Sequence, residues 1–129
     1  MIQEKINAFG KSFRLREKKD FAHLHSDSRY ISDPLFKIYY KRSLISSKNT
    51  RLGISVSRKV GNSVARNRLK RILRESFRTS KYKSLGIDLL INLRPKQFDD
   101  ISAYENSLLK RFINSLDKIY DQKHNKNFN

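Results

Sequence analysis

Residues 51–78 read RLGISVSRKVGNSVARNRLKRILRESFR, and within this stretch the hydrophobic period changes from two to about 3.6. Leu52, Ile54 and Val56 alternate with small or polar residues, which predicts a strand over 51–57 with one buried face. Asn62 or Ser63 can cap a helix, so a helix is expected from about residue 62 to 78. Its apolar stripe consists of Ala65, Leu69, Ile72, Leu73 and Phe77.

The opposite side of this helix is strongly basic. Residues 58–78 contain eight Lys or Arg and a single Glu. Like charges one turn apart disfavour an isolated helix, so phosphates lying alongside would explain the pattern, and a solvated charged face is the alternative. At 100° per residue the side chains on or beside this face are Arg66, Asn67, Arg68, Lys70, Arg71, Arg74 and Arg78.

The composition limits the choice of partner. The chain has 129 residues, which fits one domain, and carries a formal net charge of +17. A nucleic acid is therefore the expected partner, although charge alone does not separate RNA from DNA. An anionic membrane is the weaker alternative, because no run approaches the roughly 18 apolar residues of a spanning helix. We expect no membrane partner and no obligate protein partner.

The absence of cysteine excludes disulfides, thiolate zinc sites and thiol nucleophiles. The N-terminal residues lack the apolar region of a secretory signal, so the cytoplasm is the expected compartment. The three histidines have no metal-ligand company, and no protein metal site is predicted. Asp99 and Asp100 could bind Mg²⁺, but two acids before a predicted helix are more typical of dipole and cap partners.

The remaining segments predict further elements of one α+β domain. We expect a short helix over 16–25, an extra short strand near 29–31, a turn at Asp33-Pro34 and a strand over 35–41. The strand over 35–41 is expected to form a hairpin with 51–57. Residues 81–86 read as a loop and 87–93 as a strand that Pro95 ends. The predicted order is α-β-β-α-β-α, as a single sheet with helices on one face.

The C-terminal segment predicts an amphipathic helix. Ser102 and Glu105 have the spacing of a capping box. The apolar residues that follow at helical spacing are Tyr104, Leu108, Phe112, Leu116 and Ile119. We divide the chain into a flexible arm at 1–13, a domain at 14–121 and a polar tail at 122–129.

Residues 52–78, LGISVSRKVGNSVARNRLKRILRESFR, closely resemble the signature of the bacterial ribonuclease P protein family. The resemblance extends to FRLR at 13–16, KDF at 19–21, FKIY at 36–39, DLLI at 88–91 and RP at 94–95. It thus covers roughly residues 10 to 120. A nearly continuous match of this length is not expected to arise by chance.

The resemblance implies a fold and a function. The fold is a four-stranded sheet with three helices, similar to the second domain of ribosomal protein S5. It includes a left-handed βαβ crossover, whereas general base rates favour the right-handed form. The implied function is that of a protein subunit whose RNA partner removes the 5′ leader from precursor tRNA. The RNA and the substrate mainly hold the Mg²⁺ ions, so the protein carries no catalytic residue.

Two RNA-binding surfaces follow from the resemblance. The face toward the catalytic RNA comprises Arg66, Asn67, Arg68, Lys70, Arg71, Arg74 and Arg78. The leader-binding cleft comprises Phe21, His25, Tyr39, Arg58 and Lys59. His25 stands where the family usually has a second aromatic residue, which would weaken stacking there. Phe36 and Tyr39 cannot both face the cleft from one regular strand, because their spacing is odd.

Two other functions remain as alternatives. A general RNA-binding or ribosomal protein on the same scaffold would bind structured RNA without any role in leader removal. A DNA-binding protein would place the basic helix in a major groove, and would be expected to carry Asn or Gln reading residues near the helix start and a dimer surface. Neither of these two features stands out in the sequence.

Overall fold

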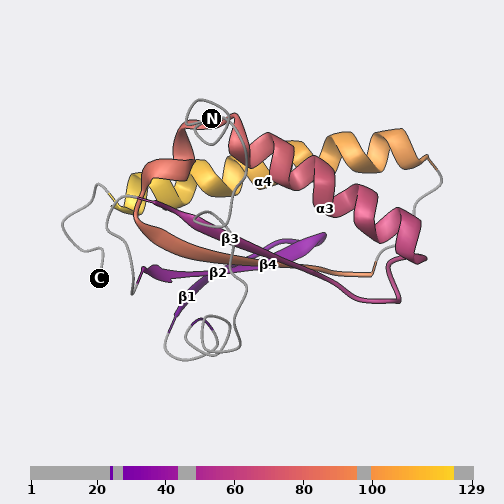
Figure 1. Cartoon of the computed structure of the whole chain (residues 1–129), viewed down its shortest axis with the longest axis horizontal. Helices are drawn as coiled ribbons and strands as arrows, with labels where there is room; N and C mark the ends of the chain where they lie inside the picture. The colour runs from indigo at the N-terminus through magenta and orange to yellow at the C-terminus, as the bar shows by residue number, and fades with distance from the viewer. Residues whose placement is uncertain (1–23, 25–27, 44–48, 96–99, 124–129) are drawn as a thin grey trace, which may run out of the picture.

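A four-stranded sheet covered on one face by two helices forms the centre of the chain (Figure 1). The structure, a computed structural model, describes residues 24, 28–43, 49–95 and 100–123. The elements are β1 (Arg29–Ser32), β2 (Phe36–Arg42), β3 (Arg51–Val56), α3 (Ser63–Arg78), the short 3₁₀ helix η2 (Lys81–Ser84), β4 (Ile87–Leu93) and α4 (Ile101–Lys123). The predicted α+β class with a four-stranded sheet is confirmed.

The strand order is β1-β2-β4-β3, with β4 antiparallel to β2 and parallel to β3. The predicted hairpin between 35–41 and 51–57 is therefore wrong, because β4 lies between these strands. Six of the seven residues of β4 are buried, so this most apolar strand takes a central position covered on both faces. The parallel pair β3–β4 is joined through α3, as a βαβ unit requires.

The helix-covered face of the sheet carries the main core. Phe36, Ile38 and Tyr40 of β2 point into this core, and the neighbouring strand β4 contributes Leu89 and Ile91. Both predicted helical stripes are confirmed, since α3 buries Leu69, Leu73 and Phe77, with Ala65 and Ile72 half-buried. Every apolar residue predicted for the C-terminal helix is buried: Tyr104, Leu108, Phe112, Leu116 and Ile119.

The turn between β1 and β2 forms as predicted at Asp33-Pro34. The Asp33 carboxylate accepts a hydrogen bond from the backbone N–H of Leu35 at 2.9 Å, which closes a local turn. The Asp33 N–H also donates to the Phe36 carbonyl at 2.9 Å. On its second oxygen, Asp33 pairs with Arg111 of α4 at 3.1 Å, so the same carboxylate also links the sheet to α4.

Side chains cap both long helices, although one predicted capping motif does not form. Asn62 caps α3 by accepting from the Ala65 N–H at 2.9 Å. At α4 the predicted capping box is wrong, because Asp100 accepts from the N–H groups of Ser102 and Ala103 at 2.9 and 3.3 Å. The interpretation of Asp100 as a cap partner is confirmed. Glu105 is consequently available for a contact outside its own helix.

The connection from α3 to β4 is more ordered than the loop predicted at 81–86. Residues 81–84 form η2, with the Ser80 side chain accepting from the Tyr82 N–H at 3.2 Å. Gly86 then adopts φ 69°, a conformation that favours glycine. Its carbonyl accepts from the Ser43 N–H at 3.0 Å, so the turn also fixes the end of β2.

The opposite face of the sheet, called the open face from here on, is not covered by α3 or α4. Leu24 is helical and fully buried, and packs there against Leu90 and Tyr39. Since Leu90 alternates with the core residues Leu89 and Ile91, Leu24 lies across the sheet from the two long helices. The expectation that all helices lie on one face of the sheet is therefore wrong, because the helical residue Leu24 lies on the other face. The rest of the predicted helix at 16–25 lies outside the described residues.

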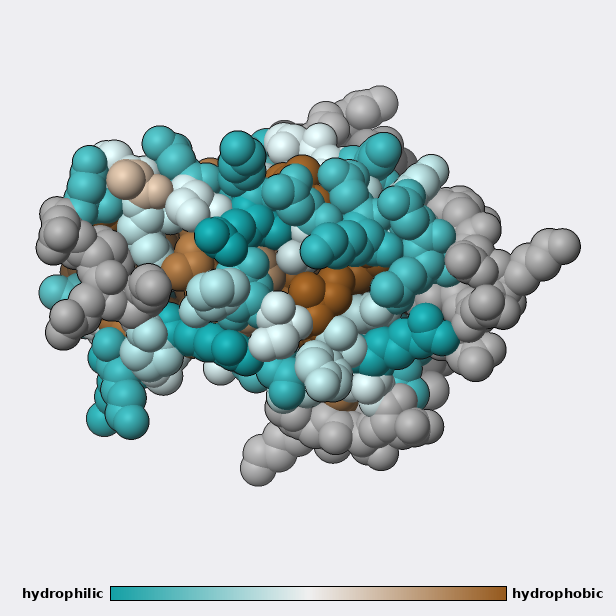
Figure 2. Space-filling view, turned by 180° about the vertical axis from the view of Figure 1, so that it is seen from behind, coloured by the Kyte–Doolittle hydropathy of each residue, from teal (hydrophilic) through white to brown (hydrophobic). Residues whose placement is uncertain are grey.

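Figure 2 shows one face of the molecule, on which hydrophilic residues surround small areas of hydrophobic surface. In the part of the chain that the structure describes, no helix combines the length and apolar character needed to cross a membrane.

Candidate nucleic-acid interface

The basic side chains of α3 form a continuous surface on the side of the helix away from its buried stripe. This surface, called the cationic ridge, comprises Arg66, Asn67, Arg68, Lys70, Arg71, Arg74 and Arg78. Asn67, Arg68 and Arg71 are exposed and the other four side chains are half-buried. The ridge is therefore accessible to a partner along all four turns of α3.

One flank of the ridge contacts α4. Arg68 donates from Nε and from its second guanidinium nitrogen to the two carboxylate oxygens of Glu105, at 2.6 and 2.9 Å. This bond lowers the pKa of Glu105 and raises that of Arg68. Arg68, predicted on the face toward the RNA, thus also joins the two helices. The pairing was hidden in the sequence because Glu105 matched a cap motif.

The residues at the two ends of the ridge, Arg66 and Arg78, have other partners. Arg78 pairs with Glu75 one turn earlier, and the hydrogen bond lowers the pKa of Glu75. Arg66 donates from Nε to the Gly61 carbonyl at 3.2 Å, which holds its guanidinium beside the start of the helix. Thus Glu75 relieves Arg78 rather than Arg71, and Arg66 contacts the turn that precedes α3.

The ridge remains strongly positive after these pairings. Glu105 and Glu75 pair with Arg68 and Arg78, which are two of the six cations of the ridge. Within the described ranges no carboxylate forms an ion pair with Lys70 or Arg71. Because like charges on neighbouring turns repel, this surface is best neutralised by a polyanion.

The open face carries a second candidate surface. Ser55 of β3 is in register with Asn92 of β4, which is in register with Lys37 of β2. These three residues form one polar row across the sheet, on the face that alternates with the core. Tyr39 lies on the same face, one row away, whereas Phe36 is fully buried on the helix side. The prediction that Phe36 and Tyr39 face opposite ways is confirmed.

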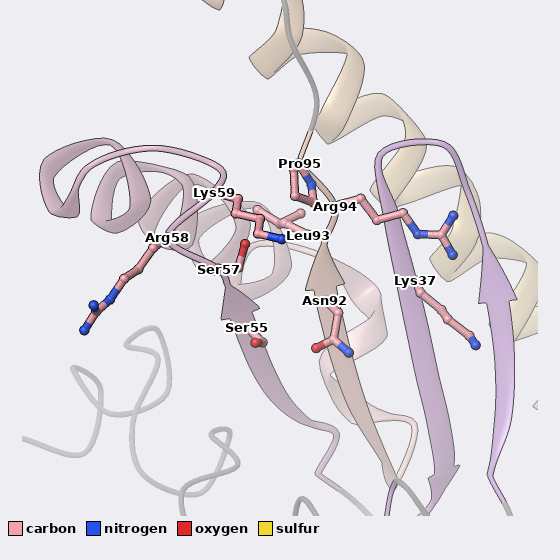
Figure 3. Close-up of a pocket in the computed structure, with 9 residues that line it drawn as sticks. All are labelled: Lys37, Ser55, Ser57, Arg58, Lys59, Asn92, Leu93, Arg94 and Pro95. Atoms are coloured by element: carbon pink, nitrogen blue, oxygen red, sulfur yellow. The ribbon is translucent and has the colours of Figure 1, made fainter.

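A cavity of about 610 Å³ lies at the ends of these strands (Figure 3). Its lining combines cations, small hydroxyls and one amide. The residues are Lys37, Ser55, Ser57, Arg58, Lys59, Asn92, Leu93, Arg94 and Pro95. Arg58 and Lys59 follow β3 on one side, while Lys37 and Arg94 extend toward β1 on the other. The cavity can thus hold an anionic chain between two pairs of cations.

The structure brings together part of the predicted leader cleft. Arg58 and Lys59 line the cavity, and Tyr39 lies beside it on the open face. Phe21 and His25 lie outside the described residues. The sequence reasoning missed Lys37 and Asn92. Their alternation with core residues was the available signal, but only the β2–β4 register shows that they are neighbours.

A buried ion pair lies near the other end of the open face. Arg51 donates to both oxygens of Asp88 at 2.9 and 2.8 Å, and the two residues are in register on the parallel strands β3 and β4. Asp88 is fully buried and Arg51 nearly so. This pair fixes the alignment of the strands that carry the cavity residues.

The acidic residues of the described chain offer no metal cluster. No group of three or more His, Cys, Asp or Glu side chains in residues 24, 28–43, 49–95 and 100–123 could hold a metal ion. Asp33, Glu75, Asp88 and Glu105 each pair with an arginine instead. These residues do not fit a protein-held Mg²⁺ site.

A family model described as Ribonuclease P matches residues 9–120, which include every element from β1 to β4 and nearly all of α4. The chain belongs to the ribonuclease P protein family. Ribonuclease P is an endoribonuclease that processes tRNA 5′ ends, and its catalysis resides in RNA. The chain is therefore a protein component with an RNA subunit as its partner.

Individual relatives support this assignment. The chain is 31% identical to the ribonuclease P protein component of Staphylococcus epidermidis over 88% of its own length and 96% of the relative's. It is 36% identical to that of a Clostridium botulinum strain, over 78% and 95% of the two chains. A solved RNase P protein from Staphylococcus aureus superposes with a TM-score of 0.65 at 28% identity, covering 92% of this chain and all of that one.

Proposed function

We propose that this ribonuclease P protein component holds two RNA segments at once. The catalytic RNA lies along the cationic ridge of α3, and the single-stranded 5′ leader of precursor tRNA lies in the cavity on the open face. The observation that carries the proposal is the separation of the two basic surfaces. The ridge is on the helix that covers one face of the sheet, and the cavity opens on the other face.

The two surfaces suit different kinds of RNA. The ridge offers closely spaced cations on a rigid helix, as contacts to the phosphates of a folded RNA require. The cavity offers hydroxyls, an amide and cations beside Tyr39, a combination that suits an unpaired strand because bases stack on aromatic rings while cations follow the backbone. With the catalytic RNA on the ridge and the leader in the cavity, the protein would align the leader with the catalytic centre of the RNA.

The proposal assigns the Mg²⁺ ions to the RNA and the precursor. In support, Asp33, Glu75, Asp88 and Glu105 each pair with an arginine, and no group of three or more acidic or histidine side chains among the described residues could hold a metal ion. The protein's part is to screen repulsion between the two RNAs, which lowers the Mg²⁺ concentration that their association needs. The reaction is proposed to take place in the cytoplasm, the compartment expected from the sequence.

Finer features of the fold belong to the same proposal. We infer that residues 16–25 form the third helix, which the helical state of Leu24 supports. The β3–α3–β4 crossover is proposed to be left-handed, as in the second domain of ribosomal protein S5. The parallel pairing of β3 with β4 across α3 meets the topological requirement for such a crossover.

Cleavage of a precursor tRNA by the cognate RNA at limiting Mg²⁺, with and without the protein, tests the proposal. The protein alone should show no cleavage, and its addition should restore leader removal. Binding of the protein to the RNA should fall with salt at a slope of roughly −4 to −7 in log K against log salt, as expected for about 5–8 phosphates. A general RNA-binding protein would bind the RNA without any gain in leader cleavage.

Variants separate the two surfaces. Arg71→Ala should weaken binding to the catalytic RNA and reduce the salt slope by about 1, with leader affinity retained in the assembled enzyme. Arg58→Ala should do the reverse. Lys110→Ala removes an exposed charge from α4 outside both surfaces and is the matched control. Equal losses in both assays for Arg71→Ala and Arg58→Ala would show that one surface, not two, binds RNA.

A further inference from the structure

The open face continues beyond the cavity toward the edge strand β1. Lys37 lies at this boundary, since it lines the cavity and also reaches two aromatic rings. Its Nζ is 4.3 Å from the ring centroid of Tyr30 and 4.9 Å from that of Tyr39. Tyr30 and Tyr39 are in register on the antiparallel pair β1–β2, with ring centroids 6.4 Å apart. A cation and two rings are therefore held together on one side of the sheet.

Tyr30 is unusual among the large hydrophobic side chains. Most such side chains in the described residues are buried in the core, whereas Tyr30 is 58% exposed. Its ring is held beside Lys37 and so loses little further freedom when a flat partner stacks on it. An exposed, pre-positioned aromatic ring next to an ammonium group suits a nucleotide, whose base can stack while its phosphate pairs with the cation.

Arg94 adds a second cation on the same side. Its guanidinium extends across β2 and donates to the Ser32 hydroxyl of β1 at 3.0 Å. Figure 3 shows Arg94 and Lys37 directed toward β1, away from Arg58 and Lys59. The cations that line the cavity thus form two groups, with Arg58 and Lys59 on the β3 side and Lys37 and Arg94 on the β1 side.

We propose that Tyr30 and Lys37, supported by Arg94, form a second nucleotide-binding position for the leader at the β1 edge of the open face. This position rests on the proposed leader-binding function and extends it to a stretch of sheet beyond the cavity. The leader crosses the strands, from Arg58 and Lys59 after β3 to Tyr30 on β1.

The strand order sets the length of leader that this path needs. From β3 to β1 there are three inter-strand steps of about 4.8 Å, or roughly 14 Å. Because stacked nucleotides are about 3.4 Å apart, about four nucleotides cover this span. Leaders shorter than about four nucleotides end before the β1 edge, so Tyr30 affects only longer ones.

The same contacts would also be explained if Tyr30 and Tyr39 formed a cross-strand aromatic pair that only stabilises the hairpin β1–β2. That explanation makes a different prediction for leader length. Loss of a purely structural ring would alter protein stability, and would affect precursors with long and short leaders alike.

The test measures the affinity of the assembled enzyme, protein plus catalytic RNA, for precursors with leaders of one, two, four, six and eight nucleotides. Tyr30→Ala and Lys37→Gln should each weaken affinity about 5- to 10-fold for the six- and eight-nucleotide leaders, and Tyr30→Ala should leave the one-nucleotide leader unchanged. Tyr30→Phe keeps the ring and should behave like the wild-type protein. Lys110→Ala is the control for loss of one charge, and urea unfolding confirms that each variant folds.

The outcomes separate this site from the function on which it rests. If wild-type affinity rises with leader length and Tyr30→Ala follows the same curve, the β1-edge position is wrong and the cavity alone binds the leader. If Tyr30→Ala weakens every leader equally, the ring has a structural role and the position is again wrong. If wild-type affinity does not depend on leader length and Arg58→Ala has no effect, leader binding itself fails, and this site fails with it.

Discussion

Among the arginine–carboxylate pairs that join distant parts of this chain, two differ mainly in their exposure. Arg51 and Asp88 connect β3 to β4 with side chains 8% and 0% exposed. Arg68 and Glu105 connect α3 to α4 with side chains 51% and 12% exposed. Both arginines use two nitrogens on two carboxylate oxygens, so the chemistry of the contact is the same.

The comparison shows how burial decides what such a pair can do. In the sheet, water cannot replace a lost partner, so each ion depends on the other and the pair holds the strands in register. On the helices, water and salt compete with the contact, and its contribution to stability is small. An exposed pair can exchange one anion for another, and a phosphate of the RNA can take the place of the Glu105 carboxylate on Arg68.

The largest expected effect is at the buried pair. Asp88→Ala should lower the free energy of unfolding by about 3–5 kcal/mol, because Arg51 would keep its buried charge without that carboxylate. Urea unfolding followed by circular dichroism measures the loss. Glu105→Ala, which breaks the exposed pair, is the matched control and should shift the transition far less. Equal losses would mean that burial does not distinguish the two pairs.

An intermediate effect is expected at the exposed pair, which lies on the proposed interface with the catalytic RNA. Glu105→Gln removes the carboxylate that competes with phosphate for Arg68, so affinity for the catalytic RNA should increase by about two- to fivefold. Filter binding at constant salt measures the change. In the double variant Arg68→Gln/Glu105→Gln the gain should disappear. A gain that persists in the double variant would show that Arg68 does not take a phosphate.

The smallest effect concerns pH. The hydrogen bond from Arg68 holds the pKa of Glu105 below its ordinary value of 4.5. A depressed folded-state pKa contributes stability above the unfolded value, and this contribution is lost as pH falls through the folded pKa. The urea midpoint of the wild-type protein should therefore decrease slightly more below about pH 4.5 than that of Glu105→Gln. Parallel pH curves for the two proteins would contradict a coupled pair.

Local patterns predicted the elements well, and their partners less well. The alternation of Leu52, Ile54 and Val56 and the stripe of α3 were read correctly, because each depends only on residues a few positions apart. The strand that pairs with β3 was predicted wrongly. Adjacent segments in sequence favour a hairpin, but the apolar strand β4 gains more by being buried between β2 and β3.

The candidate interface shows the same division. The cations of α3 and the pair Arg58 and Lys59 could be named from the sequence, because a run of charge is visible without a fold. Lys37 and Asn92 could not, since their proximity depends on the β2–β4 register. Glu105 was assigned to a cap because its spacing from Ser102 fits one, yet Asp100 already satisfies the first N–H groups of α4.

By itself, the sequence determined that this chain is a small basic α+β protein of the ribonuclease P protein family with one strongly cationic helix. These properties are additive or local, because net charge is a sum over all residues, while the hydrophobic period and the motif depend only on residues close together in the sequence. Tertiary structure alone decided which strand lies in the centre, which arginine meets which carboxylate, and that Lys37 reaches both Tyr30 and Tyr39. Such contacts join residues far apart in the chain, and only the packing of the sheet and its helices selects among the many pairings that the sequence permits.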